Sequence, residues 1–264
     1  MPVSDPLRDR LAIIVREAGA MALTASKGDL KRWIKDGNSP VSEADIAVND
    51  FLAARLPPLR PGAGWLSEET EDDLRRTDAG EVWVVDPIDG TRAYLDGRPD
   101  WAISIALVEQ GRPSLAALYA PVTDELFLAV RGGGATLNGA SIVATSGEGL
   151  DGARIAGPKR QLDLLSRLNP GVQPQPKIHS LAMRLARVGS GALDGAFASR
   201  NSHDWDLAAA DLLVHEAGGA MTDLAGQVLT YNETETRHSA LLAAGPGRHG
   251  ALIDLIRDRC AEFA

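Results

Sequence analysis

The sequence predicts a mixed α/β fold in which two helices precede a sheet and helices alternate with short strands afterwards. Three observations predict it. Apolar residues recur at helical spacing over residues 7–56, four apolar runs between residues 82 and 130 are separated by Gly, Pro and Asp turns, and helical spacing returns after residue 145. This change of pattern predicts two subdomains, residues 1–145 and residues 146–264, with most of the candidate site in the first.

The first predicted helix follows Ser4. Its apolar positions lie three and four residues apart, as an amphipathic helix requires. They are Leu7, Leu11, Ile14, Val15, Ala18 and Ala22. A polar stretch, residues 35–40, separates this helix from a second one, which Ser42 opens and Pro57 stops.

The sheet and the second half follow from the same spacing arguments. Strands are predicted at residues 82–85, 102–108, 115–120 and 125–130, with a further short strand at 241–244. Helices are predicted at residues 159–168, 180–187, 207–217 and 251–259. Short strands between these helices are expected, because the second half alternates between the two patterns.

Composition excludes several classes of protein. The 264 residues include 27 basic and 36 acidic residues, a formal net charge of −9, which argues against bulk attraction to nucleic acid or to an anionic membrane. A small anionic substrate remains compatible if the acids hold divalent cations. The single cysteine, Cys260, forms no disulfide within the chain, and no apolar run approaches the roughly 20 residues that span a bilayer. We therefore expect a cytoplasmic protein.

Two carboxylates follow the predicted strand at residues 82–85. Asp86, Asp89 and the carbonyl of Ile88 are hard oxygen ligands of the kind that Mg²⁺ prefers. Gly90 allows the backbone to approach a ligand closely, and the N–H groups of Gly90 and Thr91 suit an anionic oxygen if a helix begins there. The alternative for this stretch alone is an ordinary Asp-Gly turn after a strand.

Other carboxylates have ordinary structural explanations when each is taken singly. Glu68 and Glu69 fit a solvated acidic pair. Asp206 fits the N-cap of a helix, and Asp45 fits the acidic partner of Ser42 in a capping box. Caps and turns alone do not explain why these groups and the strand-end motif occur together in this order.

In this order the motifs resemble the inositol monophosphatase superfamily of Mg²⁺-dependent, lithium-sensitive phosphomonoesterases. That superfamily combines an early Asp, a Glu-Glu pair, Asp-Pro-Ile-Asp-Gly-Thr, and Trp-Asp followed by a spaced Gly-Gly, and all four occur here over nearly the whole chain. The resemblance implies a layered α/β/α/β/α sandwich, commonly a homodimer, with a small phosphate ester as substrate.

The resemblance also assigns roles to residues. The implied metal ligands are Glu68, Asp86, the carbonyl of Ile88, Asp89 and Asp206. The implied groups that orient and activate the attacking water are Asp45, Glu68 and Thr91. Two or three Mg²⁺ ions held in this way polarise the phosphate, lower the pKa of a bound water and stabilise the leaving alkoxide, so no covalent phosphoenzyme is needed.

The predicted substrate is adenosine 3′,5′-bisphosphate, hydrolysed to AMP and phosphate. Residues 35–41, 67–69 and 180–184 resemble the bacterial 3′(2′),5′-bisphosphate nucleotidase branch. Inositol 1-phosphate is less favoured, because Ser199 stands seven residues before Asp206, where a sugar-binding Glu is common. The predicted substrate contacts are Gly90, Thr91, Arg184 and Arg200.

Two alternatives stay open. Inositol-1-monophosphatase or histidinol-phosphate phosphatase is the first, the latter because Arg92-Ala93-Tyr94 resembles that group. The second is a non-catalytic regulator that binds protein or RNA, as some relatives do. The complete acidic set weighs against the regulator, since binding alone needs no metal ligands.

Overall fold

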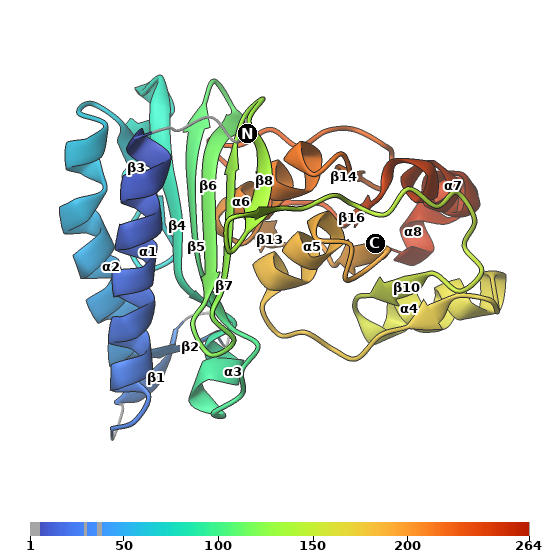
Figure 1. Cartoon of the computed structure of the whole chain (residues 1–264), viewed down its shortest axis with the longest axis horizontal. Helices are drawn as coiled ribbons and strands as arrows, with labels where there is room; N and C mark the ends of the chain where they lie inside the picture. The colour runs from blue at the N-terminus through green and yellow to red at the C-terminus, as the bar shows by residue number, and fades with distance from the viewer. Residues whose placement is uncertain (1–5, 29–30, 36–38, 264) are drawn as a thin grey trace.

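Five layers in the order α/β/α/β/α make up the protein (Figure 1). The computed structural model describes residues 6–28, 31–35 and 39–263. The predicted helix start at Ser4 and the middle of the polar stretch, residues 36–38, lie outside the described residues. The mixed α/β class and the layered sandwich are both confirmed.

Helices α1 (Pro6–Ala25) and α2 (Glu43–Arg55) form the first layer, on one face of the larger sheet. The apolar stripe of α1 is buried from Leu11 to Ala22, as its spacing predicted. The chain leaves α2 through a short 3₁₀ turn, Pro57–Leu59, because proline cannot continue a helix. No helix in the described part of the chain is long and apolar enough to cross a membrane.

The second layer is a seven-stranded sheet in which β3 and β4 are parallel and all other neighbours are antiparallel. Its strands, in spatial order, are β3 (Gly64–Ser67), β4 (Glu81–Asp89), β5 (Ala102–Glu109), β6 (Arg112–Ala120), β7 (Glu125–Val130), β8 (Gly134–Leu137) and β9 (Ala140–Ser141). The four predicted strands are its centre. Helices cover both faces, so these strands are buried almost throughout.

The middle layer consists of α5 (Leu181–Gly189) and α6 (Asp204–Glu216), which pack against each other between the two sheets. Helix α6 is buried continuously from Leu207 to Val214. A helical stretch that is buried on every face is expected only where it is enclosed on all sides, and the run Leu-Ala-Ala-Ala supplies small side chains for close packing.

The fourth layer is a five-stranded sheet. Its strands, in spatial order, are β11 (Gln173–Pro174), β10 (Arg154–Ala156), β12 (Gly195–Ala198), β16 (Leu241–Ala244) and β14 (Ala220–Asp223). The outer layer holds α4 (Lys159–Leu168), α7 (Pro246–Ile256) and α8 (Cys260–Phe263), whose apolar residues share a third core cluster with this sheet. Cys260 is half buried at the start of α8.

Shorter elements lie outside the layers. The hairpin β1 (Arg32–Lys35) and β2 (Ser39–Ser42) leads into α2, α3 (Thr91–Leu95) follows β4, and β13 (Ser202–His203) pairs with β15 (Arg237–His238). The helix predicted at residues 251–259 begins earlier, at Pro246, because proline is favoured at the first helical position. Its last residues, Arg257–Arg259, form a 3₁₀ turn.

The chain passes from one sheet to the other between β9 and β10, and the boundary predicted near residue 145 falls in this connection. Helices α5 and α6 belong to the second half but contribute most of their buried residues to the core that they share with the seven-stranded sheet. The division into two subdomains stays a prediction.

Candidate active site

The site is built around the end of β4, where the strand bends. Asp86 lies opposite Ser104 of β5 and Asp89 lies opposite Ala102, so the two aspartates are three residues apart on β4 while their partners are two apart. Such a bulge inserts one extra residue and redirects side chains. Asp86 and Asp89 are 1% and 5% exposed, and oxygens of both lie within 4.8 Å of each other and of an Asp206 oxygen.

Helix α2 brings Asp45 to this point from the first layer. Its carboxylate accepts hydrogen bonds from the backbone N–H and the hydroxyl of Ser42, at 2.8 and 2.6 Å, so the predicted capping box is present. The other Asp45 oxygen lies 3.1 Å from Thr91 Oγ1, which is equally close to the carbonyl oxygen of Ile88. Asp45 therefore caps α2, as predicted, and contacts Thr91, while its role towards the attacking water stays a prediction.

Asp89 links β4 to the start of α5. It accepts hydrogen bonds from the Ser180 hydroxyl at 2.6 Å and from the N–H groups of Leu181 and Ala182 at 3.2 and 2.6 Å. Gly90, with φ of +94°, lets the two segments meet, since a Cβ there would lie only 3.1 Å from the Ser180 nitrogen. Helix α3 begins directly after Gly90, as the anion-binding argument required.

Helix α6 brings Asp206 from the middle layer. The residue is not the N-cap that its spacing suggested; the cap is His203, and Asp206 is the third helical residue. Its carboxylate accepts the His203 N–H at 2.7 Å. No other hydrogen bond to this carboxylate is found among the described residues, which leaves its remaining lone pairs directed at the cluster.

The carboxylates raise one another's pKa. Burial raises the pKa of Asp86 well above its ordinary value, and neighbouring negative charges, that of Glu68 first, raise it further. Burial and then the charge of Asp89 raise the pKa of Asp206 in the same way. Burial also raises the pKa of Asp89 and of Asp45, but hydrogen bonds from Ser180 and Ser42 respectively offset part of that shift.

A cavity of about 310 Å³ opens over the cluster. It is lined by Pro40, Glu68, Asp86, Asp89, Gly90, Thr91, Arg92, Lys177, His179 and Asp206. Glu68 reaches it from the end of β3, where the Glu68 N–H donates to the carbonyl of Val85. Glu69 is not among the lining residues.

Sequence reasoning missed Lys177 and His179, the two residues that the segment before α5 adds to this cavity. His179 is held by Asp100, whose carboxylate lies 2.7 Å from His179 Nδ1 and accepts the His179 N–H at 2.8 Å. Burial alone would raise the pKa of Asp100, but these hydrogen bonds lower it overall. The only sequence signal was a basic residue and a histidine close before the Ser180 stretch, in a segment without periodicity.

The structure places two of the four predicted substrate contacts at the site and the other two outside it. Gly90 and Thr91 line the site. Arg184 lines a neighbouring cavity of about 570 Å³, where its guanidinium donates to the carbonyls of Ile178 and Phe197 at 2.9 and 3.0 Å. Arg200 is exposed in the turn after β12 and lines neither cavity, so its role stays a prediction.

The donor set fits hard divalent cations. Carboxylates and the Ile88 carbonyl are oxygen ligands, and neither cysteine nor histidine belongs to the predicted set, so Mg²⁺ suits it better than a softer metal. Three carboxylates within 4.8 Å of one another repel when ionised, and a bound cation offsets that repulsion. The residues present therefore fit the metal that the sequence predicted.

A layered sandwich with a buried carboxylate cluster at a strand end defines a metal-dependent hydrolase of the sugar-phosphatase type. The chain belongs to the inositol monophosphatase family, whose profile matches residues 8–259. It is therefore a metal-dependent phosphatase, of a family that uses Mg²⁺.

Known proteins agree with this assignment. The chain is 37% identical to an inositol-1-monophosphatase of Rhizobium meliloti over 195 residues, which cover 70% of this chain and 73% of that protein. It is 33% identical to the Nus factor SuhB of Escherichia coli K12 over 240 residues, which cover 86% of each. The crystal structure of the extragenic suppressor protein suhB from Bartonella henselae superimposes with a TM-score of 0.85 at 28% identity, over 97% of this chain and all of that one.

Proposed function

We propose that this protein hydrolyses a small phosphate monoester with Mg²⁺ bound by Glu68, Asp86, Asp89, Asp206 and the carbonyl of Ile88. The observation that carries the proposal is the meeting of three aspartates from β4 and α6, two of them almost fully buried, in a cavity of about 310 Å³. Mutually repelling buried carboxylates are costly to the fold, and a cation site explains why they persist.

Each protein group has a distinct task in this proposal. When bound, two or three Mg²⁺ supply charge that polarises the phosphate and activates water. Asp45 accepts a hydrogen bond from the Thr91 hydroxyl, which leaves the Thr91 oxygen lone pairs as acceptors for the attacking water. Glu68 lines the same cavity, at the end of β3, and accepts the proton that the attacking water loses.

The leaving group is assigned to the opposite side of the cavity. An in-line displacement expels the leaving group opposite the attacking water. Thr91 and Asp45 belong to α3 and α2, whereas Lys177 lines both this cavity and the neighbouring one beside α4 and α5. We therefore place the alcohol part of the substrate between Lys177 and Ser199.

Two substrates have specific support. The name of the Rhizobium meliloti relative favours inositol 1-phosphate. The cavity beyond Lys177 favours adenosine 3′,5′-bisphosphate, because it contains Ser199 in place of an acidic residue and Lys177 has no ion pair among the described residues. Arg184 already donates to two carbonyls, which makes Lys177 the better candidate for a second phosphate.

Histidinol phosphate has weaker support. Tyr94, one of the residues that suggested it, is 3% exposed, packs edge-on against Trp101 and donates its hydroxyl to the carbonyl of Ala22. Only Arg92 of that tripeptide lines the site.

Phosphate release from the three esters, compared by kcat/KM with Mg²⁺, tests the proposal. We expect activity that excess chelator abolishes and Ca²⁺ inhibits, because the looser coordination of Ca²⁺ disturbs in-line geometry. A preference of about a hundredfold, roughly 2.7 kcal/mol, identifies the substrate. Lys177→Gln should raise KM for the bisphosphate and leave KM for inositol 1-phosphate unchanged. Undiminished activity in chelator would contradict the metal site.

The regulator hypothesis has one observation in its favour, the similarity to a Nus factor. The two functions separate in cells that carry Asp89→Asn, provided that the variant is as stable as the wild type. If cells with the variant behave like cells that lack the protein, the phosphatase is supported. If they behave like cells with the wild-type protein, a binding role is supported. The homodimer and the cytoplasmic location stay predictions.

A further inference from the structure

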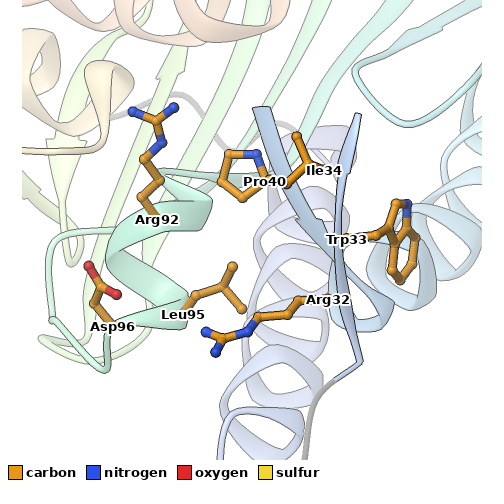
Figure 2. Close-up of a pocket in the computed structure, with 7 residues that line it drawn as sticks. All are labelled: Arg32, Trp33, Ile34, Pro40, Arg92, Leu95 and Asp96. Atoms are coloured by element: carbon orange, nitrogen blue, oxygen red, sulfur yellow. The ribbon is translucent and has the colours of Figure 1, made fainter. Parts of the chain in front are cut away.

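Arginine side chains outside the metal-ligand set are held in different ways. Arg32 and Arg92 are exposed and point to opposite ends of a cavity of about 660 Å³ between the β1–β2 hairpin and α3 (Figure 2). Arg76, by contrast, is 2% exposed, in the 3₁₀ turn Arg75–Asp78 between β3 and β4. Its guanidinium donates to both Asp72 oxygens at 2.7 to 3.1 Å. The cost of burying a guanidinium is offset only if its other N–H groups are bonded too.

The remaining nitrogen of Arg76 reaches the segment before β15. Nη1 donates to Asn232 Oδ1 at 2.8 Å and to the carbonyl of Glu233 at 3.1 Å. The Asn232 amide donates back to the Arg76 carbonyl at 3.1 Å. Asn232 has a φ of +64°, which asparagine tolerates better than most residues. Arg76 thus binds one side chain and one backbone carbonyl in residues 231–238, which we call the strap.

The strap holds the first residue of α6. Asp204 is 1% exposed, and its two carboxylate oxygens lie 2.8 Å from the Asn232 nitrogen and 2.7 Å from His238 Nε2. The Asp204 N–H donates to the carbonyl of Thr236 at 3.0 Å. The cap residue is held as well, because His203 Nδ1 lies 2.9 Å from Thr236 Oγ1. The start of α6 is therefore bound to the strap through both side chains and backbone.

The position of Asp206 depends on this attachment. The bond from the His203 N–H is the one hydrogen bond found for its carboxylate among the described residues, so the first turn of α6 determines where that carboxylate lies. Glu68, another implied ligand, follows the last residue of β3. The turn that carries Arg76 packs against the opposite end of β3, where a Cβ on Gly64 would lie 2.9 Å from the Arg76 Cβ. Arg76 thus connects the strand that leads to Glu68 with the helix that carries Asp206.

We propose that Arg76 is a positioning residue, which acts through Asn232 and Asp204 to place Asp206 for Mg²⁺. This role rests on the proposed function, because it requires Asp206 to be a metal ligand. Mg²⁺ demands nearly octahedral oxygens at about 2.0–2.1 Å, so a small shift of one ligand weakens binding. Loss of a partner that orients a ligand typically weakens metal binding about 10- to 100-fold.

Asn232→Gly removes the contact with Arg76 and little else. Glycine adopts a positive φ without strain, and the backbone N–H that donates to Asp204 remains. Asn201→Gly is the matched control, since it makes the same change at a φ of +70°, at an exposed residue whose side chain has no hydrogen bond in the described part of the chain. A calorimetric Mg²⁺ titration of the full chain, without substrate, should give a Kd at least about threefold higher for Asn232→Gly and an unchanged Kd for Asn201→Gly.

Two arginines of the same turn supply a second comparison. Arg76→Gln should raise the Mg²⁺ Kd and the Mg²⁺ concentration for half-maximal activity about tenfold. Added Mg²⁺ should restore kcat, and KM for the phosphate ester at saturating Mg²⁺ should stay unchanged, because only the coordination of the ion is weakened. Arg75→Gln removes the same charge from the adjacent exposed residue, which pairs with Asp73, and should behave as the wild type does.

A purely structural role predicts a different result. It lowers the melting temperatures of Asn232→Gly and Arg76→Gln but leaves their Mg²⁺ Kd, measured well below those temperatures, equal to that of the wild type, and this result would overturn the proposal. Equal weakening in Asn201→Gly would assign the effect to added backbone freedom and would overturn it too. Wild-type protein that binds no Mg²⁺ would refute the proposed function itself, and that result appears before any substitution is made.

Discussion

Helices α2 and α6 start on opposite faces of the seven-stranded sheet, and each brings its third residue to the end of β4. In both helices this residue is an aspartate that accepts the N–H of the residue three positions earlier, at 2.8 Å for Asp45 and 2.7 Å for Asp206. The Asp45 carboxylate also accepts the hydroxyls of Ser42 and Thr91. The Asp206 carboxylate has no such additional donors in the described part of the chain.

The groups that each carboxylate faces distinguish two uses of the same local geometry. The three hydrogen bonds of Asp45 turn its carboxylate towards Ser42 and Thr91, so it can orient these hydroxyls. Hydrogen bonds alone do not exclude a metal ligand, since Asp89 also accepts three and keeps a lone-pair site for a cation. A carboxylate with one such bond keeps lone pairs for a cation. We infer that Asp45 is a positioning residue, which acts through Thr91, and that Asp206 is a metal ligand.

Asp206→Asn should cause the largest effect, because it removes charge where a cation needs it. We expect kcat/KM to fall by at least about 10³-fold, roughly 4 kcal/mol. The His203 N–H keeps an acceptor in the amide oxygen, so the fold should persist. Asp50→Asn, the same change at an exposed position on α2, is the control and should be fully active. A loss of less than tenfold would exclude Asp206 as a ligand.

Stability of the metal-free protein should depend on pH in the same direction at the two positions, and more strongly at Asp206, whose pKa is raised further than that of Asp45. Burial raises the pKa of Asp206 well above its ordinary value. Its contribution to the free energy of unfolding is therefore fully present below the unfolded-state pKa of about 4 and is lost as the pH rises. Asp206→Asn should therefore stabilise the metal-free protein increasingly from pH 4 to pH 7. Urea unfolding in chelator measures this, and a gain that shrinks as pH rises would contradict it.

Mg²⁺ should stabilise only the proteins that keep the metal ligands. At a concentration of 100 Kd, a ligand that binds only the folded state adds about 2.7 kcal/mol to the free energy of unfolding. We expect this gain in the wild type and in Asp45→Asn, and little of it in Asp206→Asn. Thermal unfolding with and without Mg²⁺ measures it, and equal gains in all three proteins would remove the distinction between the two aspartates.

Of the two aspartate substitutions, Asp45→Asn should have the smaller effect on activity. We expect kcat to fall about 10- to 100-fold, because the hydroxyl of Thr91 loses its charged acceptor. Thr91→Ser should retain more activity than Thr91→Val, since serine keeps the hydroxyl. Unlike Asp206→Asn, Asp45→Asn should also lower the stability of the metal-free protein, because both Asp45 oxygens accept hydrogen bonds and the amide nitrogen of Asn, a donor, must replace one of them. Higher metal-free stability of Asp45→Asn would contradict this role.

The sequence predicted what local spacing determines. Helical periodicity found α1, α2, α4, α5 and α6, and the run of β-forming residues found the centre of the larger sheet. Strand β16 was predicted correctly at residues 241–244. The other strands of two to four residues in the second half were missed individually, because so few residues contain no measurable period. The final helix was predicted to start too late, because Gly247 and Gly250 weaken the helical pattern without ending the helix.

The site was predictable only as far as its motifs extend. The strand-end aspartates stand in a recognisable order, so their meeting with Asp206 was foreseeable from the resemblance. The bonds that hold Asp89 come from Ser180 to Ala182, 91 to 93 positions later, and no local rule pairs such distant residues. Lys177 and His179 likewise reach the cavity only because tertiary packing places the segment before α5 there.

The sequence distance between Asp89 and its hydrogen-bond donors also determines when the site can form during protein synthesis. When residues 1–145 have left the ribosome, Asp45, Glu68, Asp86 and Asp89 are already present in the nascent chain. The hydroxyl and amides that Asp89 needs are made about 35 residues later, at 180–182, and Asp206 follows after another 24. The nascent first half thus displays Asp89 without the partners that hold it, and the protein becomes a phosphatase only when α6 has emerged.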